Sequence, residues 1–332
     1  HARTAAGAKS SGDVVVLNKT TNAWFGKSSA DEVVAVGHGA RAQVAGDAII
    51  QAASTQYVYS LVAGFGVGGD AGAAGSVSVY RLTGHTLAGV ADRASLLAGG
   101  NVAVLAYDDS ALNRFVGSVG VGGAAGVGAS IGVTVMNQTT LASIGDNASV
   151  EGLGATNALD IRTDLAGVYA DYGSDTLAIK PPKKNDEQTG DAARATELSP
   201  TTVDAARDGA SRLFTKQRTV APVISKVKGV AVAASATNLI RAMAVGGAVG
   251  GSVGAGISAD VPVVTGDTRA TIGAGAGVNT HSASGQNAAQ SVVVAASSDL
   301  YSLAIAGGAA GGGAAGVGLG AQVTVFDAST FA

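Results

Sequence analysis

The sequence predicts an all-β protein built as a parallel β-helix, with one polar and partly helical insertion. Three observations predict this class: hydrophobic residues alternate with small ones, similar segments recur along the 332 residues, and most of these segments carry a glycine pair. The repeats are roughly 60 residues apart, and a coil of three short strands takes roughly 18–25 residues, so each repeat should supply about three coils.

Alternation of side chains distinguishes strand from helix. Between Val127 and Val135 the odd positions hold Val, Ala and Ile, whereas the even positions hold Gly, Ser and Thr. A similar alternation fills residues 253–263 and 315–325. Because this is the period of a pleated strand with one buried face, we expect the valine side to face a dry interior.

Two other interpretations of the glycine-rich stretches are disfavoured. The 24 residues from Leu303 to Phe326 carry no charge, as in a membrane helix, but their eight glycines would cost roughly 6–8 kcal/mol relative to alanine. Gly64, Gly66 and Gly69 match the G-x-G-x-x-G pattern of a phosphate-binding loop, but no helix with a ribose-binding acid follows them.

A valine-x-valine strand followed by a threonine-rich turn marks each repeat. These strands begin at residues 14, 77, 133, 261 and 323, so one separation, 128 residues, is about twice the others. Glycine pairs are expected at the corners of the coils, because glycine accepts positive φ. The alternative is a sandwich or barrel in which antiparallel hairpins fold around these pairs. The pairs are Gly68–Gly69, Gly122–Gly123, Gly250–Gly251 and Gly312–Gly313.

The doubled separation coincides with a segment of different composition. It divides the chain into repeats at 1–172, an insertion at 173–229 and further repeats at 230–332. The insertion holds ten of the 21 Lys and Arg residues and four of the five prolines, and Ser199-Pro200 predicts the start of a helix through residues 201–214. Because the sequence begins without methionine and stops within the repeat pattern, we expect a fragment of a longer chain.

The composition argues against several classes of function. The chain has no cysteine, which excludes disulfides and thiolate metal sites, and its net charge of −3 gives no attraction to nucleic acid. The four histidines have no metal-ligand spacing, so no metal or cofactor is predicted. Asp108 and Asp109 are interpreted as turn acids at a strand end, with Asp164 and Asp299 as their equivalents. We therefore predict no enzyme activity.

The few aromatic residues are assigned mainly to packing. Tyr57, Tyr59 and Tyr301 share the parity that we assign to the interior, so they should pack in the core or at a coil end. Trp24 and Phe25 follow a threonine-rich segment where other repeats carry small residues, and they too are predicted to pack locally.

The stretch "VGGAAGVGASIGVTVMNQTTLASIGDNASV", residues 121–150, resembles the repeats of filamentous-haemagglutinin-like and leukotoxin-type large adhesins of Gram-negative bacteria. The resemblance is one of pattern, and it covers most of the chain outside residues 173–229. It implies a right-handed β-helical stalk on the cell surface. It also implies an exoprotein secreted by a two-partner or autotransporter route, with an outer-membrane transporter as partner and roles in virulence, biofilm formation and cell adhesion.

The residues and the resemblance together predict a structural stalk segment of a secreted adhesin. The insertion is either a solvated spacer or an element that contacts a host or bacterial surface glycan or a receptor protein. A membrane-active toxin fragment with inserting Gly/Val hairpins and a β-helical polysaccharide-processing enzyme are the alternatives, although membrane insertion is disfavoured. The candidate contact residues are the basic side chains of the insertion: Lys180, Lys183, Lys184, Arg207, Arg212, Lys216 and Arg218.

Overall fold

The computed structural model describes residues 6–26, 39–171, 216–280 and 285–332. Every regular element in these residues is a β-strand and the long sheets are parallel, so the all-β prediction is confirmed. The chain divides into two compact units, one formed by His1–Asp164 with Val223–Ala332 and the other by Leu165–Pro222. The three parallel sheets belong to the first unit.

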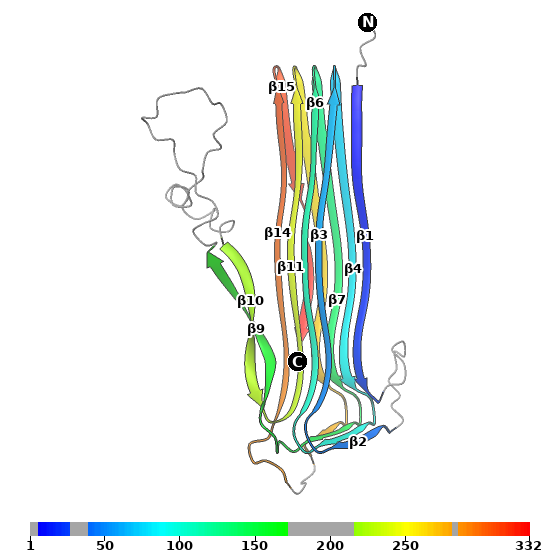
Figure 1. Cartoon of the computed structure of the whole chain (residues 1–332), viewed down its shortest axis with the longest axis vertical. Helices are drawn as coiled ribbons and strands as arrows, with labels where there is room; N and C mark the ends of the chain where they lie inside the picture. The colour runs from blue at the N-terminus through cyan, green and yellow to red at the C-terminus, as the bar shows by residue number, and fades with distance from the viewer. Residues whose placement is uncertain (1–5, 27–38, 172–215, 281–284) are drawn as a thin grey trace, which may run out of the picture. The chain divides into compact units, whose positions relative to one another are not determined.

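Strands of the first unit recur in a fixed order, a long strand of sheet A, a short strand of sheet B and a long strand of sheet C (Figure 1). Sheet A contains β1 (Ala6–Phe25), β4 (Ala71–Val90), β7 (Ala125–Ile144), β12 (Val253–Ile272) and β15 (Ala315–Gln322), with β16 (Val325–Phe331) also paired to β12. Sheet B contains β2 (Arg41–Val44), β5 (Ser95–Ala98), β8 (Ser149–Gly152) and β13 (Gly277–Val278). Sheet C contains β3 (Ala48–Gly68), β6 (Val102–Gly122), β11 (Gly229–Gly250) and β14 (Ser291–Gly312).

In all three sheets, residues that pair between neighbouring strands are separated by the same number of residues, 54, over the part of the chain from β3 to β8. Ala71 pairs with Ala125 in sheet A, Ser95 with Ser149 in sheet B, and the strand that begins at Ala48 pairs 54 residues further on in sheet C. Each repeat therefore passes once through the three sheets, and the expected three coils per repeat are wrong. That expectation rested on short strands, whereas β4 and β7 are each 20 residues long.

The predicted alternation is confirmed, but the face that it assigned to the interior is the outer one. Val127, Ile131 and Val135 lie together on the outer face of β7, where Val127 is 42% and Ile131 45% exposed, and the glycines between them are buried. The cause is the close approach of sheets A and C. A Cβ added at Gly126 would overlap the carbonyl oxygen of Val249, so no valine side chain fits between the sheets there.

The glycine pairs lie where sheet C turns into sheet A, at the upper end in Figure 1, so their predicted place at corners is confirmed. Positive φ is not the reason, because none of these glycines has it. A Cβ at Gly122 would overlap the carbonyl oxygen of Ala125, and one at Gly123 would overlap that of Gly69. The strands on either side of each turn belong to different sheets, so the antiparallel-hairpin alternative is wrong.

An aliphatic core fills the opposite end of the two long sheets, where sheet B closes the interior. Val90, Leu96, Val104, Ile144 and Val232 are almost fully buried there. Burial of each such side chain stabilises the fold by about 1.5–3 kcal/mol. A second buried cluster lies further along the two long sheets, and these two clusters, rather than the valine-glycine stretches, supply the hydrophobic interior. The members of the second cluster are Tyr80, Leu82, Leu112, Met136, Ile240 and Val264.

One turn geometry recurs two residues before each strand of sheet B. The turns stack through aspartate: Asp92 accepts a 2.9 Å hydrogen bond from the backbone N–H of Asp146, and Asp146 accepts one of 2.8 Å from Ala274. The residue after the aspartate position adopts a left-handed conformation in every case, although only two of the four are glycine. These residues are Gly39, Arg93, Asn147 and Gly275.

The aromatic side chains divide between the outer surface and local packing. Tyr57 and Tyr59 are 69% and 67% exposed on the outer face of β3, so their predicted burial is wrong, and Tyr301 on β14 is only partly buried. The error follows from the reversed face. Trp24 packs as predicted, because its indole lies against β4 so closely that a Cβ at Gly89 would overlap the ring.

The insertion leaves the sheets through a pair of strands, β9 (Leu159–Asp171) and β10 (Lys216–Val227). Within the first unit, Ile161 and Val227 are buried against the outer face of sheet C. No helix occurs among the residues that the structure describes, and the helix expected at 201–214 lies outside them.

Candidate functional site

The inner faces of sheets A and C carry charged side chains at mid-length, between the aliphatic core and the glycine-lined end. Asp13, Gly132 and Asp260 lie in one row of sheet A. Ser60 and Arg114, which pair in sheet C, reach the two carboxylates of that row. These residues form a polar layer inside the protein.

Arg114 and Asp260 form an ion pair in which neither side chain has exposed surface. The guanidinium crosses from sheet C to sheet A through the space that Gly132 leaves, since a Cβ there would contact it closely. Burial lowers the pKa of Arg114 to about 10, which still leaves the group protonated at neutral pH. Removing two such charges from water costs several kcal/mol each, so each charge requires the other.

Asp13 joins β1 to both of its neighbours. Its carboxylate accepts a 2.6 Å hydrogen bond from the Tyr80 hydroxyl of β4 and a 3.1 Å hydrogen bond from the Ser60 hydroxyl of sheet C. Burial, and next the hydrogen bond to Asp13, raises the pKa of Tyr80. The phenol therefore stays protonated and donates to the carboxylate.

A row of threonines crosses sheet A from edge to edge. The threonine-rich segments that were expected to form turns lie within the strands of sheet A. One threonine from each segment belongs to this row, and those on the inner strands of the sheet point into the interior. Thr86 donates a 2.7 Å hydrogen bond to one carboxylate oxygen of Asp108, and Ser110 donates a 2.8 Å bond to the other. The row comprises Thr21, Thr86, Thr140, Thr268 and Thr330.

Asp108 and Asp109 lie in the middle of β6 and on opposite faces, so the prediction of turn acids is wrong. Asp108 is 1% exposed in the interior, whereas Asp109 forms an outer ion pair with Arg162 at 3.3 Å. Asp299 lies in the same outer row of sheet C as Asp109, which confirms that the two are equivalent, but Asp164 lies on β9. Carboxylates on opposite sides of a sheet do not form the pair that glycoside hydrolysis uses.

A narrow slot between the sheets lies toward β14 and β16, lined in part by Val264, Gly266 and Leu300. Gln138 enters it and donates a 2.6 Å hydrogen bond to the Ser110 hydroxyl. The remaining amide oxygen of Gln138, that of Asn238 and the Thr140 hydroxyl are buried with no hydrogen-bond partner among the described residues. Amide and hydroxyl groups in such a slot suit ordered water.

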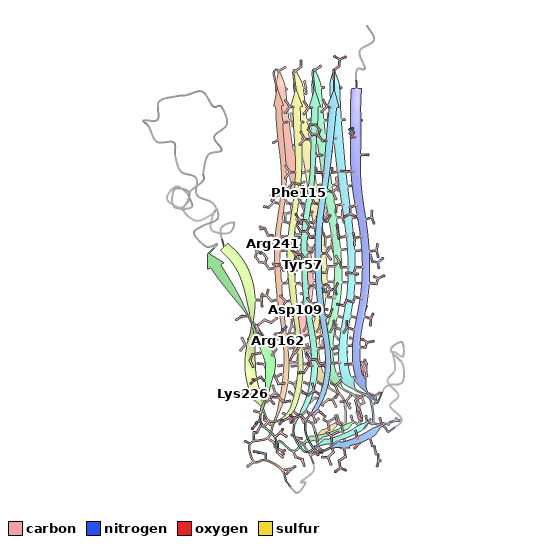
Figure 2. The ribbon with its side chains drawn as sticks, viewed as in Figure 1. Tyr57, Asp109, Phe115, Arg162, Lys226 and Arg241 are labelled. Carbon is pink, nitrogen blue, oxygen red and sulfur yellow. The ribbon has the colours of Figure 1, made fainter. Side chains whose placement is uncertain are left out.

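A second polar cluster lies on the outside, where the insertion leaves sheet C. The Arg162 guanidinium lies 4.8 Å from the centre of the Tyr107 ring and donates to the Ser235 hydroxyl at 3.2 Å. Burial raises the pKa of Tyr107. Figure 2 shows Arg162 near Asp109. This cluster fixes the base of β9 on the sheet.

The predicted contact residues of the insertion are not brought together by the residues that the structure describes. Lys216 and Arg218 lie in β10. The other five, Lys180, Lys183, Lys184, Arg207 and Arg212, lie outside the described residues.

The described parts of the chain hold neither a group of metal-binding side chains nor a membrane-spanning helix. No cluster of three or more His, Asp or Glu side chains there is arranged to hold a metal ion. In the same residues, no helix has the length and hydropathy needed to span a membrane.

Sequence reasoning did not select Asp13, Arg114 or Asp260. A signal was present, because Asp260 continues the alternating series of Gly254, Gly256 and Ser258 on the face opposite to the valines. A charged residue within that small-residue series marks a polar group in the interior once the interior face is known.

No family model matches this chain, and no curated protein or solved structure is significantly similar to it.

Proposed function

We propose that the three sheets are the faces of a right-handed parallel β-helix with one coil per repeat. We further propose that the chain is a structural segment of the stalk of a secreted bacterial adhesin. The observation that supports the β-helix is the common register, because the successive strands β3, β4 and β5 pair with β6, β7 and β8 at the same separation of 54 residues in all three sheets. The right hand follows the general rule for parallel crossover connections.

The inner contacts favour a structural role. Asp13, Asp108 and Asp260 all accept hydrogen bonds from side chains of other strands, so these interior carboxylates are used within the protein. Each repeat contacts mainly the repeats beside it, and each adds about 4.8 Å to the stack. Length in such a protein is set by the number of repeats.

The adhesin part of the proposal adds the resemblance and the insertion. Export through an outer-membrane transporter and display on the cell surface follow from the resemblance. Arg162 and Ile161 of β9, the strand that leads into the insertion, are held on the outer face of sheet C, so the insertion can contact a surface glycan or receptor without disturbing the sheets.

The experiment adds one coil. Residues 71–124 are duplicated in frame, which is the 54-residue period, and the first copy carries Arg114→Ala because Ala242 occupies that row in β11. The expected product is folded, with about 4.8 Å added along the stacking direction in small-angle X-ray scattering. A matched control duplicates only residues 71–97 and should not fold, since it lacks the sheet C strand. Equal stability of both variants would contradict the one-coil repeat.

A further inference from the structure

The outer face of sheet A is uncharged from the glycine turns down to the row just above Arg81. We call these five rows of outward residues the valine face. Its only polar side chain is Ser10, and the rest are Ala, Gly, Val, Ile and Leu. Six of its aliphatic side chains are each 42–49% exposed: Val77, Val127, Ile131, Val253, Ile257 and Val317.

The valine face is larger than an ordinary surface patch. Five strands about 4.8 Å apart and five rows about 6.6 Å apart give an area of about 800 Å². The largest apolar patch of a soluble monomer is typically about 300–600 Å², and larger ones mark interaction sites. The next rows bring Arg81, Thr83 and Asn137, so the face ends at a polar border.

Described residues of the chain cover part of the other long sheet, whereas none of them covers this one. At the lower end of sheet C, Ile161 and Val227 pack on outward residues that include Leu105 and Ala231. No described residue packs in the same way on the valine face. The aliphatic outer face of sheet C is therefore one on which other β-strands of the chain pack.

We propose that the valine face docks against the valine face of a second copy of this chain. The area is about the 800 Å² per partner of a stable protein interface. Its side chains are small and β-branched on in-register strands, so two copies present the same spacing in both directions. The ridges of one face can then lie in the grooves of the other at the sheet separation of about 10 Å.

The composition of the face favours a protein partner over lipid. Surfaces that lie in a bilayer carry Trp and Tyr where they cross the interface, and the valine face has no aromatic residue. The upper outer face of sheet C is less regular, with Tyr57, Phe115 and the charged Arg241 along it (Figure 2). We therefore assign the self-association to sheet A alone.

Sedimentation velocity of the chain with two pairs of substitutions tests the assignment. Ile131→Glu with Ile257→Glu places two carboxylates in the valine face, and Phe65→Glu with Val249→Glu is the matched control on sheet C at similar exposure. The unsubstituted chain and the control should dimerise. The valine-face variant should dimerise about 100-fold more weakly or not at all, because buried unpaired carboxylates oppose association.

A cysteine variant gives a second readout that does not depend on charge. The chain has no cysteine, so Ile131→Cys introduces a single thiol at the centre of the valine face, and Val249→Cys introduces one on sheet C. Mild oxidation should cross-link the Ile131→Cys protein into a dimer much faster than the Val249→Cys protein. Circular dichroism establishes that both remain folded.

Three results would overturn the proposal: a monomer at 100 μM or so for the unsubstituted chain, loss of the dimer only in the sheet C variant, or equal cross-linking at both cysteines. Co-flotation of the chain with phosphatidylcholine vesicles, abolished by Ile131→Glu with Ile257→Glu, would assign the valine face to lipid instead. The β-helix and stalk proposal survives each of these outcomes, because it rests on register and not on this surface.

Discussion

The buried ion pair gives the sharpest test of the interior. In the variant Asp260→Ser, Arg114 keeps its charge but loses the one carboxylate that pairs with it among the described residues. In the unsubstituted protein neither side chain of this pair has exposed surface. Two further nitrogens of this guanidinium, Nε and Nη1, already lack hydrogen-bond partners in the part of the chain that the structure describes. Removing one member of such a pair destabilises a protein by about 3–5 kcal/mol.

The neighbouring repeats supply the control. The row of Arg114 holds Ser60, Ala242 and Ala304 in the other strands of sheet C, and the row of Asp260 includes Ser78 in β4. The double variant Arg114→Ala with Asp260→Ser therefore restores side chains that this interior already accommodates. It should lie within about 1 kcal/mol of the unsubstituted chain, because both charges are gone.

Urea denaturation followed by circular dichroism gives the free energy of unfolding of four proteins: the unsubstituted chain, Asp260→Ser, Arg114→Ala and the double variant. The single variants should unfold at markedly lower urea than the double variant. If the free energy of unfolding of each single variant fell by less than about 1 kcal/mol, the ion pair would be solvated, and this result would contradict its burial in the polar layer. If the double variant were as unstable as the singles, the loss would come from packing and not from charge.

Three further predictions concern the glycine-lined interior, Asp47 and the basic residues of the insertion. Gly128→Val should destabilise the chain by more than about 2 kcal/mol, because a Cβ there overlaps the carbonyl oxygen of Gly247. Gly75→Ala should be neutral in thermal unfolding, because its Cβ would meet only the Cβ of Ser10, at an ordinary contact distance of 4.0 Å. The pKa of Asp47 is lowered, because hydrogen bonds from Thr156 and Asn101 outweigh the opposing effect of burial. The stabilisation of the folded state by ionised Asp47 is therefore complete above the ordinary carboxyl pKa of 3.8 and declines as the pH falls below that value. The difference in Tm between the unsubstituted chain and Asp47→Asn should shrink between pH 5 and pH 2 or so. Replacing four basic residues of the insertion with serine should weaken salt-sensitive retention on heparin resin, and unchanged retention would remove the anionic-glycan hypothesis; the four are Lys183, Lys184, Arg212 and Lys216.

The strands and their repetition could be predicted because they depend on local pattern. Val127 and Ile131 do share a face, and the glycine pairs do lie at turns. Which face is buried could not be predicted in the same way, because alternation defines two faces but not the distance between facing sheets. Gly126 is buried because the carbonyl oxygen of Val249 comes too close for any side chain, and that contact joins strands far apart in the sequence.

The number of coils in each repeat was predicted wrongly for a related reason. The threonine-rich segments were interpreted as turns, which cut each long strand into shorter ones. Thr86 instead satisfies its hydroxyl on Asp108 of the facing sheet, so the segment continues as a strand through β4. Only the partner across the interior shows that such a polar residue is not at a turn.

The glycine-lined end of the long sheets has a consequence for the order in which the chain folds. Glycine loses more backbone entropy on ordering than other residues do, and residues such as Gly126 and Gly254 bury no side chain in return. The end near Val104 and Val232 buries the most aliphatic surface, so strand pairing should begin there during folding and proceed toward the glycine turns. Amide hydrogens beside Gly122 should then exchange with solvent sooner than those of the aliphatic end.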